Sequence, residues 1–309
     1  RRTLIGGEEQ LKTFKRESLI NFYRKWYNPD MQAVIVIGDF DVEMMEQKIA
    51  KIFGDIPPPA VPTEKIEYQL PVNEKPIVGI LTDPEAQESS IEVIWKTAPL
   101  PKQYMNTDMA YLQSIVKAYI RLVMNERFSD ITSKPDAPFL DASFAMGGLC
   151  NTSDAVFGNV SFKDGNAIPA FTAYMTELEK MKRFGFSEGE VKRATENLLS
   201  SFEKAVEAAD TRKNADLVKP LLSNFYDNKP YLDPETEQMI GKQFCSMITA
   251  PMLSQVVSQV IPDQNLIILY TGPEKEGLSH PTEAELTAVL ESVANSDIQA
   301  NTEDNLDKP

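Results

Sequence analysis

The stretch Leu11–Pro59 decides the fold and reads LKTFKRESLINFYRKWYNPDMQAVIVIGDFDVEMMEQKIAKIFGDIPPP. Its first part spaces apolar residues three and four positions apart until an Asn-Pro pair interrupts them, which predicts one amphipathic helix. The β-branched run Ala33–Ile37 is too short for a buried helix and predicts a strand covered on both faces. Asp39 or Asp41 can then cap a second amphipathic helix over Val42–Phe53.

Prolines interrupt every periodic pattern between Gly54 and Pro76, which predicts a semi-extended linker. Ser187 with Glu190 three residues later is a capping box and predicts a helix start. A hairpin turn is expected around Gly147 and Gly148. Apolar and strand-like patterns predict strands over 77–81, 89–96, 140–145, 155–162 and 266–270. Helical patterns predict helices over 107–131, 169–184, 187–209, 252–261 and 282–293.

One order of elements occurs twice in the chain. A helix, a Pro-Asp pair, an apolar strand and a glycine run over 19–38 and again over 252–272, and each copy is followed by a further helix. Two copies predict two related domains, and a chance recurrence of common elements is the alternative. The expected organisation is given by four segments: 1–56 as the C-terminal part of a first domain, 57–76 as a proline-rich linker, 77–294 as a complete second domain, and 295–309 as a disordered acidic tail.

The sequence resembles those of the insulinase/pitrilysin family of zinc metallopeptidases, the inverzincins. The residues that carry this resemblance are Ile5, Gly6, Glu9, Leu19, Phe22, Tyr23, Tyr27, Pro29, Val34, Val36, Gly38, Asp39, Asp41, Phe53, Gly54, Ile56 and Pro57. It continues through Asp136–Phe139, Lys163–Gly165 and Arg183–Glu190. The resemblance implies an α+β fold in two layers, with an antiparallel or mixed sheet covered by helices. It implies one complete domain preceded by a terminal helix-strand-helix piece of a related domain.

The chain lacks the zinc motif of that family. Such peptidases use an inverted H-x-x-E-H helix with two histidines one turn apart and a glutamate base, whereas His280 is the single histidine of this sequence. We therefore predict no catalytic, cofactor-binding or metal-binding residue in this chain. The resemblance implies that zinc belongs to an intact parent enzyme and that this chain is a fragment of it.

Two hypotheses for function follow from the resemblance. In the first, the chain is the non-catalytic portion of the N-terminal half of a zinc endopeptidase and helps to form a chamber for peptides or unfolded polypeptides. Zinc in that parent would polarise the peptide carbonyl and activate water, with a glutamate outside this chain as general base. In the second, the parent is a degenerate, metal-free member that binds peptides or a partner protease. A bacterial periplasm or cell envelope is the expected location.

Composition limits the classes of partner. The net charge of −15 argues against nucleic acid, because phosphate binding needs a basic face. No run of about 18 apolar residues suggests a membrane span. Cys150 and Cys245 are expected to be unpaired and mostly buried, although the sequence leaves a disulfide open.

Other residues favour structural roles. Five glutamates alternate with lysine and arginine and are expected on a solvated helix face: Glu177, Glu179, Glu188, Glu190 and Glu196. Four aromatic residues at helical spacing favour core or interdomain packing over a peptide platform: Phe22, Tyr23, Trp26 and Tyr27. His280 is expected at the surface. The strand Ala33–Ile37 has no neighbouring strand in its own segment, so residues 1–56 are expected either to dock on the second domain or to form a homodimer.

Overall fold

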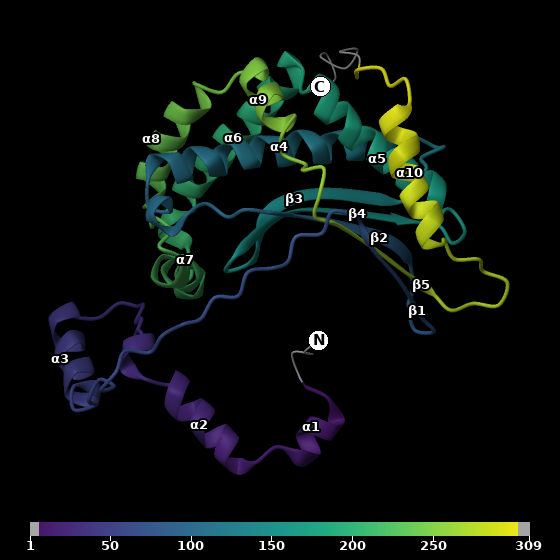
Figure 1. Ribbon diagram of the computed structural model, residues 1–309. Helices are drawn as coiled ribbons and strands as arrows, with labels where there is room; N and C mark the ends of the chain where they lie inside the picture. Colours follow the sequence, from purple (N-terminus) through teal and green to yellow (C-terminus); the bar gives the residue numbers. More distant parts are fainter. Residues whose placement is uncertain (1–5, 302–309) are drawn as a thin grey trace. The chain divides into compact units, whose positions relative to one another are not determined.

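The computed structural model describes residues 6–301 and divides the chain into two units (Figure 1). The smaller unit consists of the residues up to Glu67 together with Arg212–Asp227. The larger unit consists of Tyr68–Thr211 and the residues from Asn228 onward.

The smaller unit is built from short helices without a buried core. Its elements are α1 (Glu8–Thr13), α2 (Arg16–Trp26), the 3-10 helix η1 (Pro29–Met31), α3 (Val42–Phe53) and α7 (Asn214–Asp227). The prediction of one continuous helix before the Asn-Pro pair is wrong, because Phe14 and Lys15 are extended, with ψ angles of 144° and 140°. A helix is stabilised mainly by packing of its apolar face, and no residue of α1 or α2 is buried.

The predicted strand Ala33–Ile37 is also absent from the described residues. This segment is extended but belongs to no sheet, and Val34 and Val36 are 50% and 41% exposed. A strand forms only when neighbours pair with it, and the smaller unit supplies no such neighbour among its described residues. The helix-strand-helix piece is therefore a helix, an extended segment and a helix. The cap of α3 is confirmed, since Asp41 accepts a 2.8 Å hydrogen bond from the Met44 amide.

The larger unit contains one five-stranded mixed sheet. Its strands are β1 (Ile77–Asp83), β2 (Ser89–Thr97), β3 (Asp141–Cys150), β4 (Ser153–Phe162) and β5 (Leu266–Pro273). They lie in the order β1-β5-β2-β4-β3. β1 and β5 are parallel, and the other neighbours are antiparallel. The hairpin turn lies after Cys150 rather than at Gly147 and Gly148, which continue β3 opposite Ala155 and Asp154.

Helices of the larger unit cover one face of this sheet (Figure 1). They are α4 (Asp108–Thr132), α5 (Ala167–Phe184), α6 (Glu188–Glu207), α8 (Pro234–Cys245), α9 (Ala250–Val257) and α10 (Glu283–Asn295), with short turns η2 (Lys102–Tyr104) and η3 (Ala209–Thr211). α4 packs on β3, α5 on β2 and β4, and α10 on β1. The core between the layers includes fully buried Tyr119, Phe144 and Tyr174. The expected two-layer α+β fold with a mixed sheet is confirmed.

The helix starts follow the capping signals of the sequence. Thr107 caps α4, and the Ser187–Glu190 capping box opens α6. Two helices were not predicted, namely α7 and α8. α7 contains Pro220 in its interior, a residue that ordinarily ends a helical pattern.

The segment after α10, which begins the tail expected to be disordered, is described through residue 301 and contacts the rest of the larger unit. Ile298 is only 8% exposed and belongs to the core. Arg183 donates hydrogen bonds to the carbonyl groups of Ala294 and Ser296, at 2.6 and 2.9 Å. One apolar anchor and one arginine thus fix a polar segment, while residues 302–309 lie outside the described part. None of the helices over 6–301 is long and apolar enough to cross a membrane.

Candidate functional site

The potential metal ligands of the chain do not fit a zinc site. A zinc peptidase site of the inverted type needs two histidines one turn apart, and this sequence has one. Within residues 6–301, no three histidine, cysteine or acidic side chains gather closely enough to hold a metal. No catalytic step through zinc is therefore assigned to this chain.

His280 lies in a partly buried position rather than at the surface as expected. Its Nδ1 is 3.0 Å from the hydroxyl of Tyr270 in β5, and the two ring centroids are 5.7 Å apart. Asp164 accepts hydrogen bonds from Lys275 at 2.7 Å and Ser89 at 2.9 Å. These bonds lower the pKa of Asp164. Because they tie the loop after β5 to the ends of β2 and β4, we interpret the group as structural.

The two cysteines occupy different environments. Cys150 is exposed at the end of β3, and hydrogen bonds from Thr152 lower the pKa of its thiol. Cys245 is buried in α8, and burial raises the pKa of its thiol. Both are free thiols. The expectation that both are mostly buried is therefore wrong for Cys150.

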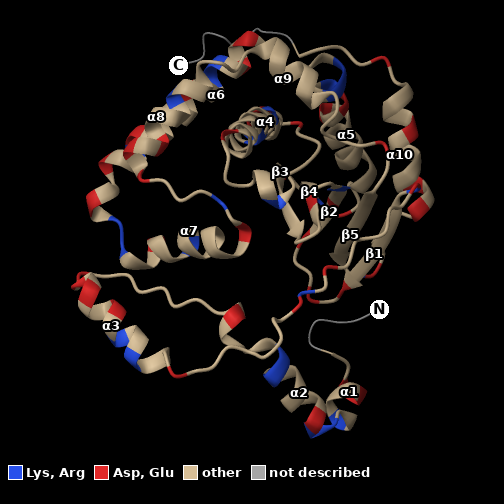
Figure 2. Ribbon diagram, turned by 60° about the vertical axis from the view of Figure 1, so that its left-hand side comes forward, with Lys and Arg blue, Asp and Glu red and all other residues tan. Residues whose placement is uncertain are grey.

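Acidic and basic residues are interspersed along the helices of the larger unit (Figure 2), and two of the glutamates named above pair with cations on their own helix. Glu177 pairs with Lys180 at 2.7 Å, and Glu179 pairs with Arg183 at 2.6 Å. Glu177 and Glu190 are nevertheless buried, at 6% and 8% exposed. The expectation of a solvated face is wrong at these two positions.

Glu190 makes a buried ion pair with Arg127 of α4. Arg127 Nε and Nη2 donate to the two carboxylate oxygens at 2.6 and 2.9 Å, and Nη2 also donates to the Gly185 carbonyl at 2.9 Å. Burial alone would raise the pKa of Glu190, but the hydrogen bonds and charge of Arg127, with the bonds from Ser187, outweigh burial and lower it. The pair joins α4 to the junction of α5 and α6.

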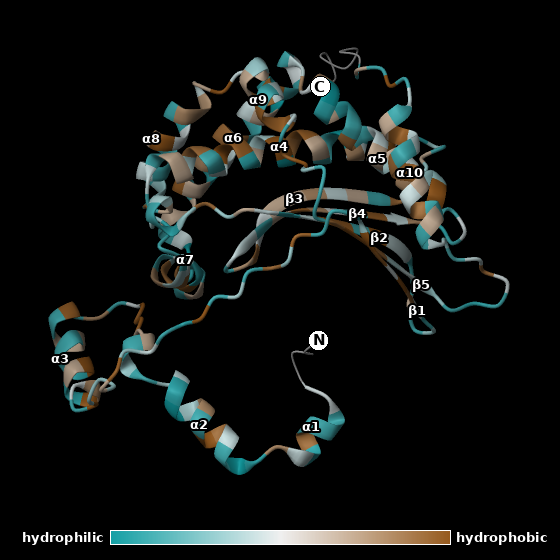
Figure 3. Ribbon diagram, viewed as in Figure 1, coloured by the Kyte–Doolittle hydropathy of each residue, from teal (hydrophilic) through white to brown (hydrophobic). Residues whose placement is uncertain are grey.

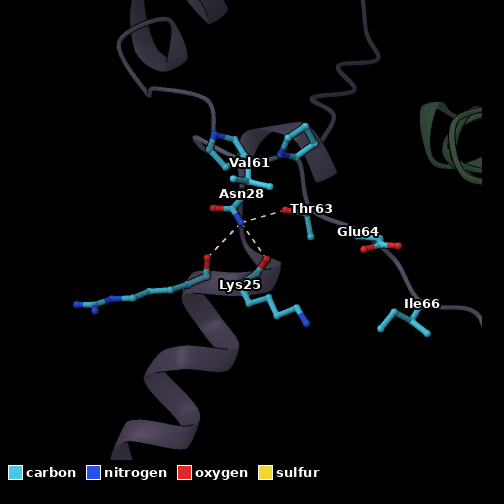
Figure 4. Close-up of a pocket in the computed structure, with 9 residues that line it drawn as sticks. Lys25, Asn28, Val61, Thr63, Glu64 and Ile66 are labelled. Carbon is cyan, nitrogen blue, oxygen red and sulfur yellow. Dashed lines mark hydrogen bonds between the residues drawn. The ribbon is translucent and has the colours of Figure 1, made fainter.

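A shallow hollow of about 340 Å³ lies in the smaller unit at the end of α2 (Figure 4). Asn28 lies at its centre and donates to the Arg24 and Lys25 carbonyls at 3.1 and 2.9 Å and to Thr63 at 3.2 Å. Asp30 accepts from the Thr63 amide at 2.7 Å. These bonds cap α2 and attach the proline-rich linker to it, so they explain the hollow by local structure.

The aromatic residues of α2 are not packed in a core within their unit. Phe22, Tyr23 and Tyr27 are between 57% and 61% exposed. Tyr23 stacks on Tyr27 with ring centroids 4.8 Å apart, and Phe22 lies 6.3 Å from Trp26. The packing predicted for them is not found among the described residues of the smaller unit.

Among the described residues of the larger unit, one face of the sheet carries no helix (Figure 3). We name this the uncovered face. Its strand residues alternate with core residues such as Ile91 and Val93 of β2, which are at most 1% exposed. Neighbouring positions on the uncovered face form an apolar row with one member from each strand: Ile77, Ile267, Ile94, Phe157 and Ala145. Their register makes the row continuous across the sheet.

This apolar row is accessible within the larger unit. Ile77 is 52% exposed, Ala145 is exposed, and the three central members are half-buried. The row was not identified from the sequence, because it depends on the register of five strands. Apolar residues on both faces of β2 were the available signal.

Comparison with known proteins places this geometry in context. A family model described as the peptidase M16 inactive domain matches residues 13–198. The crystal structure of the first half of the periplasmic protease PqqL from Escherichia coli is similar, with a TM-score of 0.83 and 21% sequence identity. The similarity covers 96% of this chain and 63% of that one.

Two curated relatives from Escherichia coli show how much of a longer protein the chain represents. It is 22% identical to the probable zinc protease PqqL over 84% of its own length and 28% of that protein. It is 23% identical to the protein YhjJ over 89% of its own length and 55% of that protein. The chain therefore spans about a quarter to a half of the curated relatives that it matches.

Proposed function

From the premise that this chain belongs to the peptidase M16 family, we propose that it is a non-catalytic portion of the N-terminal half of a zinc-dependent endopeptidase. In this proposal it helps to form the chamber that receives peptides or unfolded polypeptides. The parent protein holds the zinc, and the substrate meets this chain without being cut by it.

The match to the inactive domain of the family carries this proposal. The similar fold of the first half of PqqL supports a place in the N-terminal half of a longer enzyme. The name of PqqL as a probable zinc protease supports a zinc-dependent parent. The description of that protease as periplasmic supports a periplasmic location for the parent.

A second candidate function is that of a metal-free family member that binds peptides or a partner protease. The similarity to YhjJ favours it, because that relative is matched over a larger share of its length and its name states no protease activity. The two candidates differ in the parent protein and agree that this chain performs no catalysis.

The domain organisation remains part of the proposal. Residues 1–56 would complete a first domain, 57–76 would link it, and 77–294 would form a second, non-catalytic domain. The division between the two units at Glu67 and Tyr68, inside this linker, supports the boundary between the domains, whereas Arg212–Asp227 of the second segment groups with the smaller unit. Residues 1–56 would contact the remaining domains of the parent or a second copy of the chain.

Metal analysis and peptide hydrolysis on the isolated chain and on its parent test the proposal. We expect stoichiometric zinc and cleavage of an unfolded protein such as casein by the parent, and neither by the chain. One tightly held zinc per isolated chain would overturn our assignment. A parent without zinc or cleavage would establish the second candidate instead.

Light scattering after size exclusion tests the homodimer. A mass of two chains, reduced to one by removal of residues 1–56, would support it. A strict monomer in which these residues are protease-sensitive would reject it.

A further inference from the structure

We propose that the apolar row on the uncovered face binds an extended polypeptide segment that carries apolar side chains with basic residues beside them. This inference rests on the proposed function, because it assigns the surface with which this chain would hold an unfolded substrate.

The dimensions of the apolar row suit a short extended segment. Neighbouring strands lie about 4.8 Å apart, so a row across five strands is roughly 20 Å long. An extended chain advances about 3.3 Å per residue, so about six residues span this row. Apolar side chains placed on Ile94, Phe157 and Ile267 would remove partly exposed surface from water, which favours association.

One border of the row is closed by the chain itself. The strap, which we define as Tyr68–Asn73, crosses the sheet beside the row. The Tyr68 carbonyl accepts a hydrogen bond from Thr152 at 2.9 Å, and Asn73 donates to the Leu266 carbonyl at 3.0 Å. Ala155, two residues from Phe157 on the same face, is only 2% exposed. Extended polypeptide therefore already covers the neighbouring positions of this face.

Charge on the uncovered face favours a basic partner. Its strand positions carry three acidic residues, Asp83, Glu92 and Asp141. Its one basic residue, Lys96, is 8% exposed and donates a hydrogen bond to the Pro71 carbonyl in the strap. Glu92 lies beside the row, since it is two residues from Ile94 along β2. Lysine or arginine next to the apolar side chains of a bound segment would meet Glu92, whereas Asp83 and Asp141 lie farther along their strands from the row.

The same charges disfavour a second copy of the chain on this face. Two uncovered faces brought together would place acidic residues opposite acidic residues, and like charges in an interface oppose association. The whole chain carries a net charge of −15, which adds to that repulsion. A basic, apolar, extended segment is thus the occupant that this surface fits best.

Fluorescence anisotropy with two labelled peptides of about ten residues tests this inference on the full chain. One peptide alternates leucine and lysine, and the other alternates leucine and glutamate. We expect the lysine peptide to bind and the glutamate peptide to bind at least about tenfold more weakly. Phe157→Ser should raise the Kd of the lysine peptide about tenfold.

Two further variants separate binding from folding. Met239→Ser changes a methionine of α8 that is 65% exposed and lies outside the uncovered face, so it should leave binding unchanged. Glu92→Gln preserves the shape of the side chain and removes its charge. It should weaken binding of the lysine peptide several-fold and should not weaken binding of the glutamate peptide. Circular dichroism of each variant must match that of the native chain.

Several results would overturn the inference. The first is that neither peptide binds, and the second is that Phe157→Ser and Met239→Ser lose equal affinity for the lysine peptide. The third is a dimer of the chain that Phe157→Ser dissociates. The fourth is slow hydrogen exchange at the row because the smaller unit covers it. A parent that holds zinc and cleaves casein equally well with and without Phe157→Ser rejects only this inference. A parent without zinc or cleavage rejects the proposed function even if the row binds peptide.

Discussion

Arg127 of α4 and Glu190 of α6 are joined by two hydrogen bonds of 2.6 and 2.9 Å while their side chains are 8% and 11% exposed. The same carboxylate accepts a 2.8 Å bond from the Ser187 amide and so completes the capping box of α6. One glutamate therefore starts a helix and attaches it to its neighbour.

Arg127→Met is expected to destabilise the larger unit by about 3–5 kcal/mol, because it leaves the buried charge of Glu190 without its partner. Urea unfolding followed by circular dichroism measures this loss. Arg193→Met is the matched control, since Arg193 pairs with Glu126 where both side chains are about a third exposed. Arg193→Met should lower the free energy of unfolding by at most about 1 kcal/mol. Equal losses in the two variants would contradict a special role for the buried pair.

Acid should weaken the Arg127–Glu190 pair. The pKa of Glu190 is lower in the folded chain than its ordinary value of 4.5, so the unfolded chain takes up the proton first as pH falls. The stability that this group contributes is present above about pH 4.5 and is lost as pH falls through the folded pKa. Urea unfolding between pH 7 and pH 3 measures the free energy of unfolding of the native protein and of Glu190→Gln. The difference between these two free energies should shrink as the pH falls. A difference that stays constant would reject the assignment.

Gly158 is expected to tolerate no side chain. A Cβ atom there would lie 1.9 Å from the Tyr174 hydroxyl, which donates a 3.0 Å hydrogen bond to the Ser143 carbonyl. Gly158→Ala should cost about 1–3 kcal/mol or more through overpacking, measured by thermal and urea unfolding. Gly147→Ala is the control on the adjacent strand, because no atom lies within 4 Å of its Cβ position. A similar loss at Gly147 would show that strand propensity, rather than the close approach, determines the effect.

Ile298→Ala should destabilise the larger unit by about 2–4 kcal/mol, as expected for truncation of a buried isoleucine. Met239→Ala, at a residue 65% exposed, should change stability by no more than about 0.5 kcal/mol. Both are measured by urea unfolding of the full chain. If Ile298→Ala proves neutral, the segment after α10 is not an anchored part of the unit.

The sequence predicted the elements whose signals are local. Strand patterns identified β1, β2 and β4, helical patterns identified α4 and α10, and the capping box at Ser187 located the start of α6. The prediction failed where stability depends on distant residues. Val34 and Val36 have the composition of a strand, but a strand also needs neighbours for its backbone.

The buried position of Glu190 could not be inferred from its helix alone. Its spacing to nearby lysines fits a solvated face, and only the packing of α4 brings Arg127 opposite it. The burial of Ile298 could not be predicted either, because one apolar residue in an acidic segment gives no periodic signal. The absence of a paired-histidine zinc motif, by contrast, was evident from the single histidine.

The position of β5 between β1 and β2 has a consequence for synthesis of the chain. β2, β3 and β4 lie within residues 89–162, so they can pair soon after they leave the ribosome. β1 emerges earlier, but its neighbour in the sheet is β5, which is made only at residues 266–273. During that interval the apolar segment IVGILTD has no native partner and is prone to pair with other nascent chains. A chaperone that shields this segment until β5 appears would raise the yield of folded protein without changing its stability.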